Sequence, residues 1–101
     1  MLKLYKFYWD AGRQGSVEGL FVEDPVEIEK RIGGNVYFGE ILGKHSEVYG
    51  TLEEVDLTVV SEDQEKINWL VSILGYSISG YNPVDYMEEF DMEQEESDAE
   101  E

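Results

Sequence analysis

Few residues in this chain have the chemistry of a catalytic site. The only histidine is His45, and a nucleophile–base pair would need Ser46 or Ser16 beside it, which no spacing in the sequence arranges. Two spaced carboxylates can carry out acid–base chemistry, but 24 acidic residues single out no pair. The chain has no cysteine to bind a metal as thiolate, and the acids from Asp91 onward lack the glycine of an EF-hand loop. We therefore expect a protein without enzymatic activity, metal or cofactor.

Two predicted turns, Asp10–Ser16 and Gly43–Ser46, gather basic and polar groups in an otherwise acidic chain. The residues that could contact an anion such as a nucleotide are Arg13, Gln14, Lys44, His45 and Ser46. Glycines in both turns could leave backbone N–H groups free for the same ligand, namely Gly12, Gly15 and Gly43. Neither turn has the GxxxxGK[ST] spacing of a phosphate-binding loop, and exposed turns often contain these residue types without a ligand. A ligand site and ordinary turn chemistry are both consistent with the pattern.

Acidic residues give the chain a formal charge of −17. Residues 85–101 hold ten acids and no base, and the remainder still has more acids than bases. So strong a negative field repels nucleic acid and anionic membranes, and it attracts basic surfaces. We expect no direct binding of nucleic acid or membrane, and we predict a basic, nucleic-acid-binding protein as the partner. Solubility alone also favours acidic surfaces.

The predicted contacts with this partner come from two parts of the chain. Carboxylates on a rigid scaffold can imitate the phosphates of a duplex, and those of the folded part are Glu47, Glu53, Glu54, Asp56, Glu62, Asp63 and Glu65. An apolar trio among acids can dock into a basic groove, and the C-terminal set is Asp85, Tyr86, Met87, Glu88, Glu89, Phe90 and Asp91. The alternatives are a plain polar surface for the first set and a solvated extension for the second.

The strongest helical signal lies in Ser61–Leu74. Ser61 and Gln64 have the spacing of a capping box, and Gly75 is suited to end the helix. Apolar residues recur at i, i+3, i+4 and i+7 and should pack on a sheet: Ile67, Leu70, Val71 and Leu74. A second, shorter helix is predicted after the N-cap Asp24.

Strands are predicted at Leu2–Trp9, Val17–Glu23, Asn35–Leu42, Glu47–Leu52, Leu57–Val60 and Tyr76–Ser79. Aromatic residues at strand spacing are predicted to form the core: Tyr5, Phe7, Trp9, Phe21, Tyr37 and Phe38. The fold class is α+β, a mostly antiparallel sheet of four to six strands with two helices on one face, in the order ββα-ββα. This order would place the two turns at the same end of one sheet.

The chain is long enough for one domain, predicted at residues 1–83. Residues 84–101 are predicted as an acidic tail, with a short amphipathic helix after Asn82 and disorder beyond it. The N-terminus lacks the pattern of a signal peptide, and no stretch reaches the roughly 18 apolar residues of a membrane span. We expect a cytoplasmic protein, and an open sheet edge would allow a dimer.

A short cysteine-free chain with acids spread over an αβ body, ending in DMEQEESDAEE, resembles the small phage-encoded inhibitors of host DNA-binding enzymes. Those include DNA-mimic antirestriction, anti-CRISPR and glycosylase-inhibitor proteins. The resemblance covers the whole chain in kind and matches no residue motif, so no site residues carry over. It implies an inhibitor that presents carboxylates to the basic groove of a nucleic-acid-acting enzyme. The alternatives are a nucleotide-binding protein that uses the two turns and an adaptor that docks through Tyr86, Met87 and Phe90.

Overall fold

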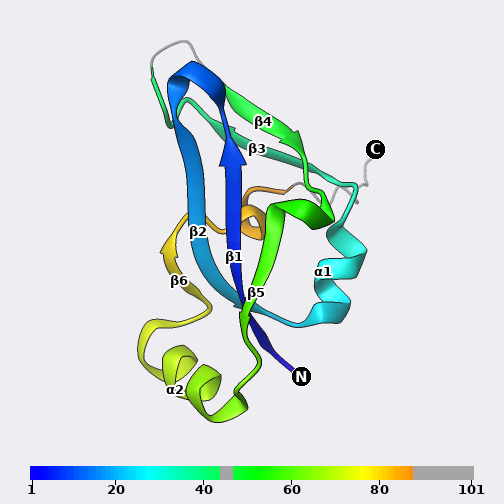
Figure 1. The fold of residues 1–101 in the computed structure, drawn as a ribbon, viewed down its shortest axis with the longest axis vertical. Helices are drawn as coiled ribbons and strands as arrows, with labels where there is room; N and C mark the ends of the chain where they lie inside the picture. Colours follow the sequence, from blue (N-terminus) through cyan, green and yellow to red (C-terminus); the bar gives the residue numbers. More distant parts are fainter. Residues whose placement is uncertain (44–46, 88–101) are drawn as a thin grey trace, which may run out of the picture.

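Six strands, all paired antiparallel, build the part of the chain that the structure describes (Figure 1). The computed structural model describes residues 1–43 and 47–87. A four-stranded sheet has the order β5-β1-β2-β6, and β3 and β4 form a separate two-stranded sheet. The strands are β1 (Lys3–Asp10), β2 (Ser16–Glu23), β3 (Asn35–Gly39), β4 (Val48–Thr51), β5 (Leu57–Ser61) and β6 (Ser77–Gly80). Together with two helices, this arrangement confirms the predicted α+β class.

The hairpin β1–β2 occupies the middle of the larger sheet, with Phe7 opposite Gly19 and Trp9 opposite Val17. Its alternating side chains face opposite sides, so Phe7 is buried while Lys6 is exposed. The predicted order ββα-ββα would make the second half of the chain a copy of the first. The strand pairing differs from such a repeat, because β5 pairs with β1 and not with the β3–β4 hairpin. The β1–β2 turn still lies beside the end of β3 and the start of β4, but these strands belong to different sheets (Figure 1).

Strand β5 forms one open edge of the larger sheet. Its pairing with β1 shifts register between Leu4, which faces Ser61, and Tyr5, which faces Val59. Val60 is therefore the extra residue of a β-bulge.

Helix α1 (Pro25–Arg31) begins as the sequence predicts, because the Asp24 carboxylate accepts a hydrogen bond of 2.9 Å from the Val26 N–H. Helix α2 (Gln64–Leu74) begins two residues later than predicted. Its N-cap is Asp63, whose carboxylate accepts hydrogen bonds from the first turn of the helix, and the predicted capping box at Ser61 is absent. Aspartate and serine are both strong N-cap residues, so the pattern alone could not choose between them.

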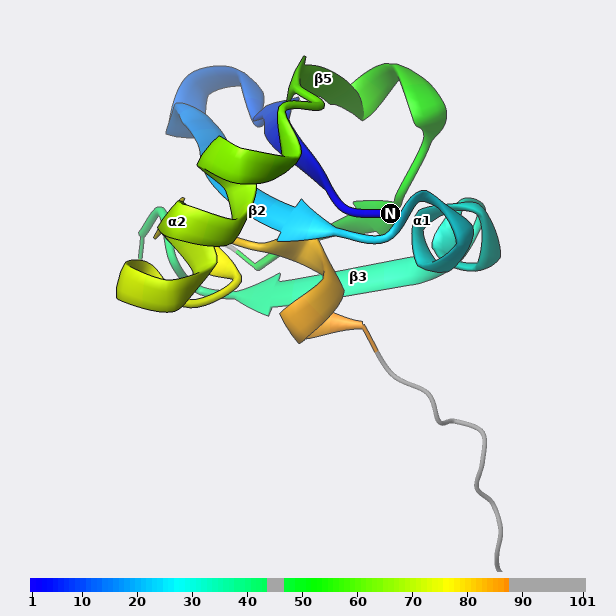
Figure 2. The same cartoon turned by 90° about the horizontal axis from the view of Figure 1, so that it is seen from below.

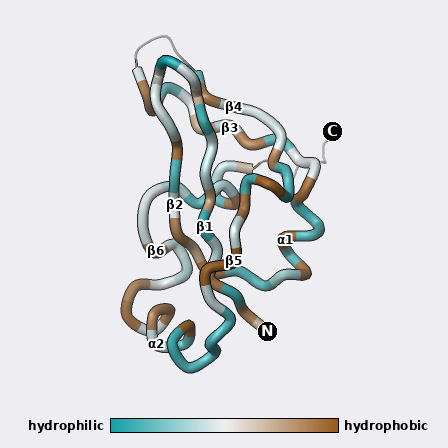
Figure 3. The backbone as a smooth tube through the Cα atoms, viewed as in Figure 1, coloured by the Kyte–Doolittle hydropathy of each residue, from teal (hydrophilic) through white to brown (hydrophobic). Residues whose placement is uncertain are grey.

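Helix α2 packs at one end of the larger sheet, against β1 and β6, and lies far from α1 (Figures 1 and 2). The two helices therefore do not lie side by side. Of the predicted apolar stripe, Ile67 is buried but Leu74 is exposed. The C-terminal half of α2 is hydrophobic, as its brown colour in Figure 3 shows, and its residues Ile73 and Leu74 are exposed.

The core lies between the two sheets. Phe7, Val17 and Phe21 from the larger sheet meet Val36, Phe38 and Val48 from the β3–β4 hairpin, which covers one face of that sheet (Figure 2). Each fully buried aliphatic or aromatic side chain of this kind contributes about 1.5–3 kcal/mol relative to an exposed one. The hairpin is thus held in place by the packing of its inner face.

The chain continues to pack on the core beyond Pro83. Asn82 caps a short 3₁₀ helix, η3 (Pro83–Tyr86), by accepting a hydrogen bond of 3.0 Å from the Val84 N–H. Met87 then forms an antiparallel bridge with Val36 of β3. The described body therefore extends through Met87, and the helix predicted after Asn82 is one turn of 3₁₀ helix within residues 82–87.

Candidate functional site

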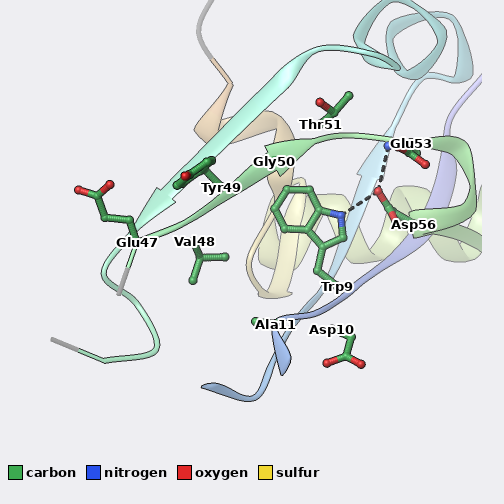
Figure 4. Close-up of a pocket in the computed structure, with 10 residues that line it drawn as sticks. All are labelled: Trp9, Asp10, Ala11, Glu47, Val48, Tyr49, Gly50, Thr51, Glu53 and Asp56. Atoms are coloured by element: carbon green, nitrogen blue, oxygen red, sulfur yellow. Dashed lines mark hydrogen bonds between the residues drawn. The ribbon is translucent and has the colours of Figure 1, made fainter. Parts of the chain in front are cut away.

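An acidic groove of about 590 Å³ runs between the end of β1 and strand β4 (Figure 4). Four carboxylates line it, those of Asp10, Glu47, Glu53 and Asp56, and Trp9 provides an aromatic wall. Three of these acids are among the predicted partner-binding residues. The groove exists because the second hairpin packs its inner face on the first and brings β4 alongside Trp9.

The indole of Trp9 is fixed in this groove. Its Nε1–H donates a hydrogen bond of 2.7 Å to the Asp56 carboxylate, and the same oxygen accepts a 2.9 Å bond from the Glu53 N–H. On the other side, a Cβ added at Gly50 would lie 3.3 Å from the Trp9 ring, closer than ordinary contact. Asp56 therefore orients the groove wall as well as contributing its charge.

The carboxylates of the groove are separate from the ion pairs found within the described ranges. Those pairs join Lys3 to Glu62 at 3.8 Å, Lys30 and Arg31 to Glu27 at 3.4 and 3.8 Å, Lys66 to Asp63 at 3.9 Å, and the N-terminus to Asp24 at 3.6 Å. The groove carboxylates of Asp10, Glu47, Glu53 and Asp56 take part in none of these pairs.

The remaining predicted acids flank the edge strand β5. The 3₁₀ helix η2 (Glu54–Asp56) precedes this strand, and Glu62, Asp63 and Glu65 follow it at the start of α2. Five strand residues at about 3.3 Å each separate the two acidic clusters by roughly 17 Å. At the α2 end, Lys3 and Lys66 pair with acids that are themselves largely exposed. Exposed pairs are weak, so the Glu62 carboxylate stays available to a partner, whereas that of Asp63 also caps α2.

Exposed tyrosines cover the outer face of the β3–β4 hairpin. Tyr37 and Tyr49 lie opposite each other in the register, and their rings stack with centroids 6.3 Å apart. They are 50% and 67% exposed, so the prediction that Tyr37 belongs to the core is wrong. The pattern contained the missing signal: Tyr37 and Phe38 are neighbours in one strand and must face opposite sides.

The Tyr37 hydroxyl is linked to the acids of this region. A hydrogen bond with Glu47 raises the pKa of Tyr37 above its usual range, and the negative charges of Glu47 and Glu40 raise it further. Tyr37 thus ties one groove carboxylate to the tyrosine face.

We predict that Glu47→Gln lowers the pKa of Tyr37, because the neutral amide no longer disfavours the phenolate. A pH titration of phenolate absorbance measures the change, with Tyr37→Phe assigning the transition. Glu65→Gln, an exposed substitution in the first turn of α2, serves as the control and should leave the curve unchanged, because Glu65 contributes to neither raised tyrosine pKa. Identical titrations of the Glu47→Gln and unmodified proteins would contradict the hydrogen bond.

The turn Asp10–Ser16 is less open to an anion than the sequence suggests. Its glycines donate within the turn: the Gly12 N–H donates to the Asp10 carboxylate at 2.8 Å and the Gly15 N–H to the Gly12 carbonyl at 3.1 Å. The expectation that these two groups are free is therefore wrong. Arg13 is exposed and Gln14 completes the short 3₁₀ helix of the turn, while Lys44, His45 and Ser46 lie outside the described residues. The nucleotide site stays a prediction.

Some of the C-terminal candidate residues lie among the described residues and the others lie outside them. Asp85 accepts a hydrogen bond of 3.0 Å from the Ser77 hydroxyl, and the Tyr86 ring packs 4.8 Å from that of Phe38. Met87 packs against the core, whereas Glu88, Glu89, Phe90 and Asp91 lie outside the described residues. Two members of the apolar trio proposed for docking thus contact the protein's own body.

Within residues 1–43 and 47–87, no three histidine or acidic side chains are grouped so that they could hold a metal ion. The helices of this part of the chain are all too short or too polar to cross a membrane. These features define an acidic α+β protein with an aromatic-walled, carboxylate-lined groove. No protein-family model, curated protein or solved structure matches the chain.

Proposed function

We propose that this chain is a non-enzymatic, cytoplasmic binding protein that inhibits a nucleic-acid-acting enzyme of its host. In this proposal, its carboxylates occupy the basic groove of that enzyme in place of a duplex. The observation that supports the proposal is the pair of acidic clusters at the two ends of the exposed edge strand β5. Both clusters come from rigid elements, a 3₁₀ helix and the first turn of α2.

The separation of the clusters suits this role. One turn of B-DNA rises roughly 34 Å, and each of its two strands crosses a given face once per turn. Phosphates of the two strands therefore recur on one face at an average spacing of roughly 17 Å. Strand β5, which lies between the two clusters, itself spans a similar length of roughly 17 Å. The groove carboxylates add charge beside the first cluster.

The test is affinity capture of host proteins on the tagged full-length chain, followed by assay of the captured enzyme. We expect a DNA- or RNA-acting enzyme that is inhibited by the chain and released by competing duplex. Salt of about 0.5 M should also release it, since exposed charges are then screened over distances beyond a few ångströms. Affinity that does not change with salt would contradict the proposal.

Two variants that lose the same number of charges test whether the positions of the carboxylates matter or only the net charge of the protein. Glu54→Gln with Glu65→Gln removes one carboxylate from each end of β5, and Glu18→Gln with Glu29→Gln removes two exposed acids elsewhere. Neither acid of the first pair caps a helix through its side chain, so both proteins should fold. We expect the first variant to bind the captured enzyme roughly tenfold more weakly than the second. Equal losses would show that net charge alone attracts the partner.

A further inference from the structure

A second groove, of about 580 Å³, lies on the outer face of the β3–β4 hairpin. Tyr37 and Tyr49 form one side and Tyr86 borders it, with Gly50 and Asn35 also lining it. We call it the tyrosine groove. The inner face of the hairpin is already buried in the core, so the exposed rings of Tyr37 and Tyr49 have no packing role there. Several exposed aromatic rings gathered around one groove are typical of a binding surface.

The walls of the tyrosine groove are held in place before any ligand arrives. Tyr37 and Tyr49 stack on each other, with ring centroids 6.3 Å apart. The Tyr86 ring contacts Phe38 at 4.8 Å and Tyr81 at 6.0 Å. Binding therefore costs little side-chain entropy, which favours a ligand that is itself rigid.

Charge decides which ligand fits. Aromatic platforms for nucleic-acid bases are surrounded by cations, whereas the acids Glu40 and Glu47 lie beside Tyr37 and the chain carries −17 overall. Anionic lipid surfaces are repelled for the same reason. The carboxylates instead favour arginine, whose guanidinium binds a carboxylate through two hydrogen bonds.

Shape and hydrogen bonding point to one kind of peptide. Polyproline II segments dock into aromatic-lined grooves and lose little entropy, because they are already extended in solution. Their backbone carbonyls have no internal partners, so they can accept hydrogen bonds from the Tyr49 hydroxyl and from the Asn35 amide. We propose that the tyrosine groove binds a proline-rich segment of a partner protein, with an arginine of that segment beside Glu47.

The test uses synthetic peptides and calorimetric titration of the full chain. Two peptides repeat the pattern Pro-x-x-Pro, with arginine before the first proline in one and after the last in the other, because a polyproline II segment can dock in either direction. Companion peptides replace either the arginine or all prolines with alanine. We expect one arginine-bearing peptide to bind and both of its companions to bind about tenfold more weakly or not at all.

Tyrosine variants locate the site. Tyr37→Ala should weaken binding about tenfold or more, as truncation of a central aromatic residue does, and Tyr37 lines the tyrosine groove but not the acidic groove. Tyr76→Ala is the matched control, since Tyr76 is 55% exposed and lies outside the tyrosine groove, and it should bind as the unmodified chain does. Unchanged binding by Tyr37→Ala would overturn the proposal. So would failure of both peptides, equal binding of the proline-free companion, or tighter binding of a single-stranded oligonucleotide. These outcomes do not depend on the inhibitor function proposed above.

Discussion

Gly19→Ala is expected to destabilise the protein by about 3 kcal/mol, the upper end of the range for overpacking. Gly19 lies in the middle of β2 and faces Gly80 of β6. A Cβ at this position would overlap the Tyr81 carbonyl oxygen and lie 2.6 Å from the carbonyl carbon. Backbone cannot swing aside as a flexible side chain can, and here it is also tied down by the Tyr81 N–H, which donates to the Glu18 carbonyl at 3.0 Å. The substitution must therefore separate β6 and the start of η3 from β2.

Urea unfolding of Gly19→Ala measures this loss, and Gly33→Ala provides the comparison. A Cβ at Gly33 meets nothing within 4 Å, but its φ of 91° strains an alanine by about 1 kcal/mol. The steric overlap in Gly19→Ala should thus lower the free energy of unfolding more than the backbone strain in Gly33→Ala does. A smaller loss for Gly19→Ala than for Gly33→Ala would contradict the observed packing of Tyr81 on β2.

Phe38→Ala is expected to cost about 3–5 kcal/mol, the range for truncation of a buried phenylalanine. The Phe38 ring contacts Phe7 and Trp9 of β1 at 5.9 and 5.5 Å. It also contacts Tyr81 and Tyr86 at 5.7 and 4.8 Å. One side chain therefore joins the two sheets and the C-terminal 3₁₀ helix. Since whole domains are stable by only about 5–15 kcal/mol, its loss would leave a small margin.

The matched control for Phe38→Ala is Val55→Ala, because Val55 is 85% exposed. An exposed substitution of this kind should change stability by no more than about 0.5 kcal/mol. Thermal and urea unfolding of the two variants measure the difference. Loss of Phe38 should also release Tyr86 from its ring contact, so peptide binding at the tyrosine groove should fall in any folded fraction. Similar unfolding midpoints for both variants would contradict the role of Phe38 in joining the sheets.

Local chemistry allowed much of the fold to be predicted. Asp24 followed by proline marks the start of α1, Asn82 followed by proline marks η3, and Gly75 ends α2 with a positive φ of 82°. Each signal acts within a few residues, where backbone and side chain meet directly. The choice of Ser61 as the cap of α2 failed because Asp63 competes for the same role.

The partition of strands into two sheets could not be predicted in the same way. Alternation shows which residues of a strand share a face, but the partner of a strand depends on contacts far along the chain. The Asp56 carboxylate reaches Trp9 across 47 positions of sequence. For this reason the sequence could predict which acids belong to the site. It could not predict that these acids meet in one groove, or that Tyr37 and Tyr49 are exposed beside each other.

The bulge in β5 affects how the protein behaves at high concentration. An open strand edge with exposed valines, such as Val59 and Val60, is a template for edge-to-edge aggregation. Here the extra residue at Val60 twists the edge, and carboxylates lie at both of its ends. A second copy that paired antiparallel along β5 would bring like charges together at each end. The same carboxylates that are proposed to attract a basic partner therefore oppose fibril growth and dimers formed through this edge.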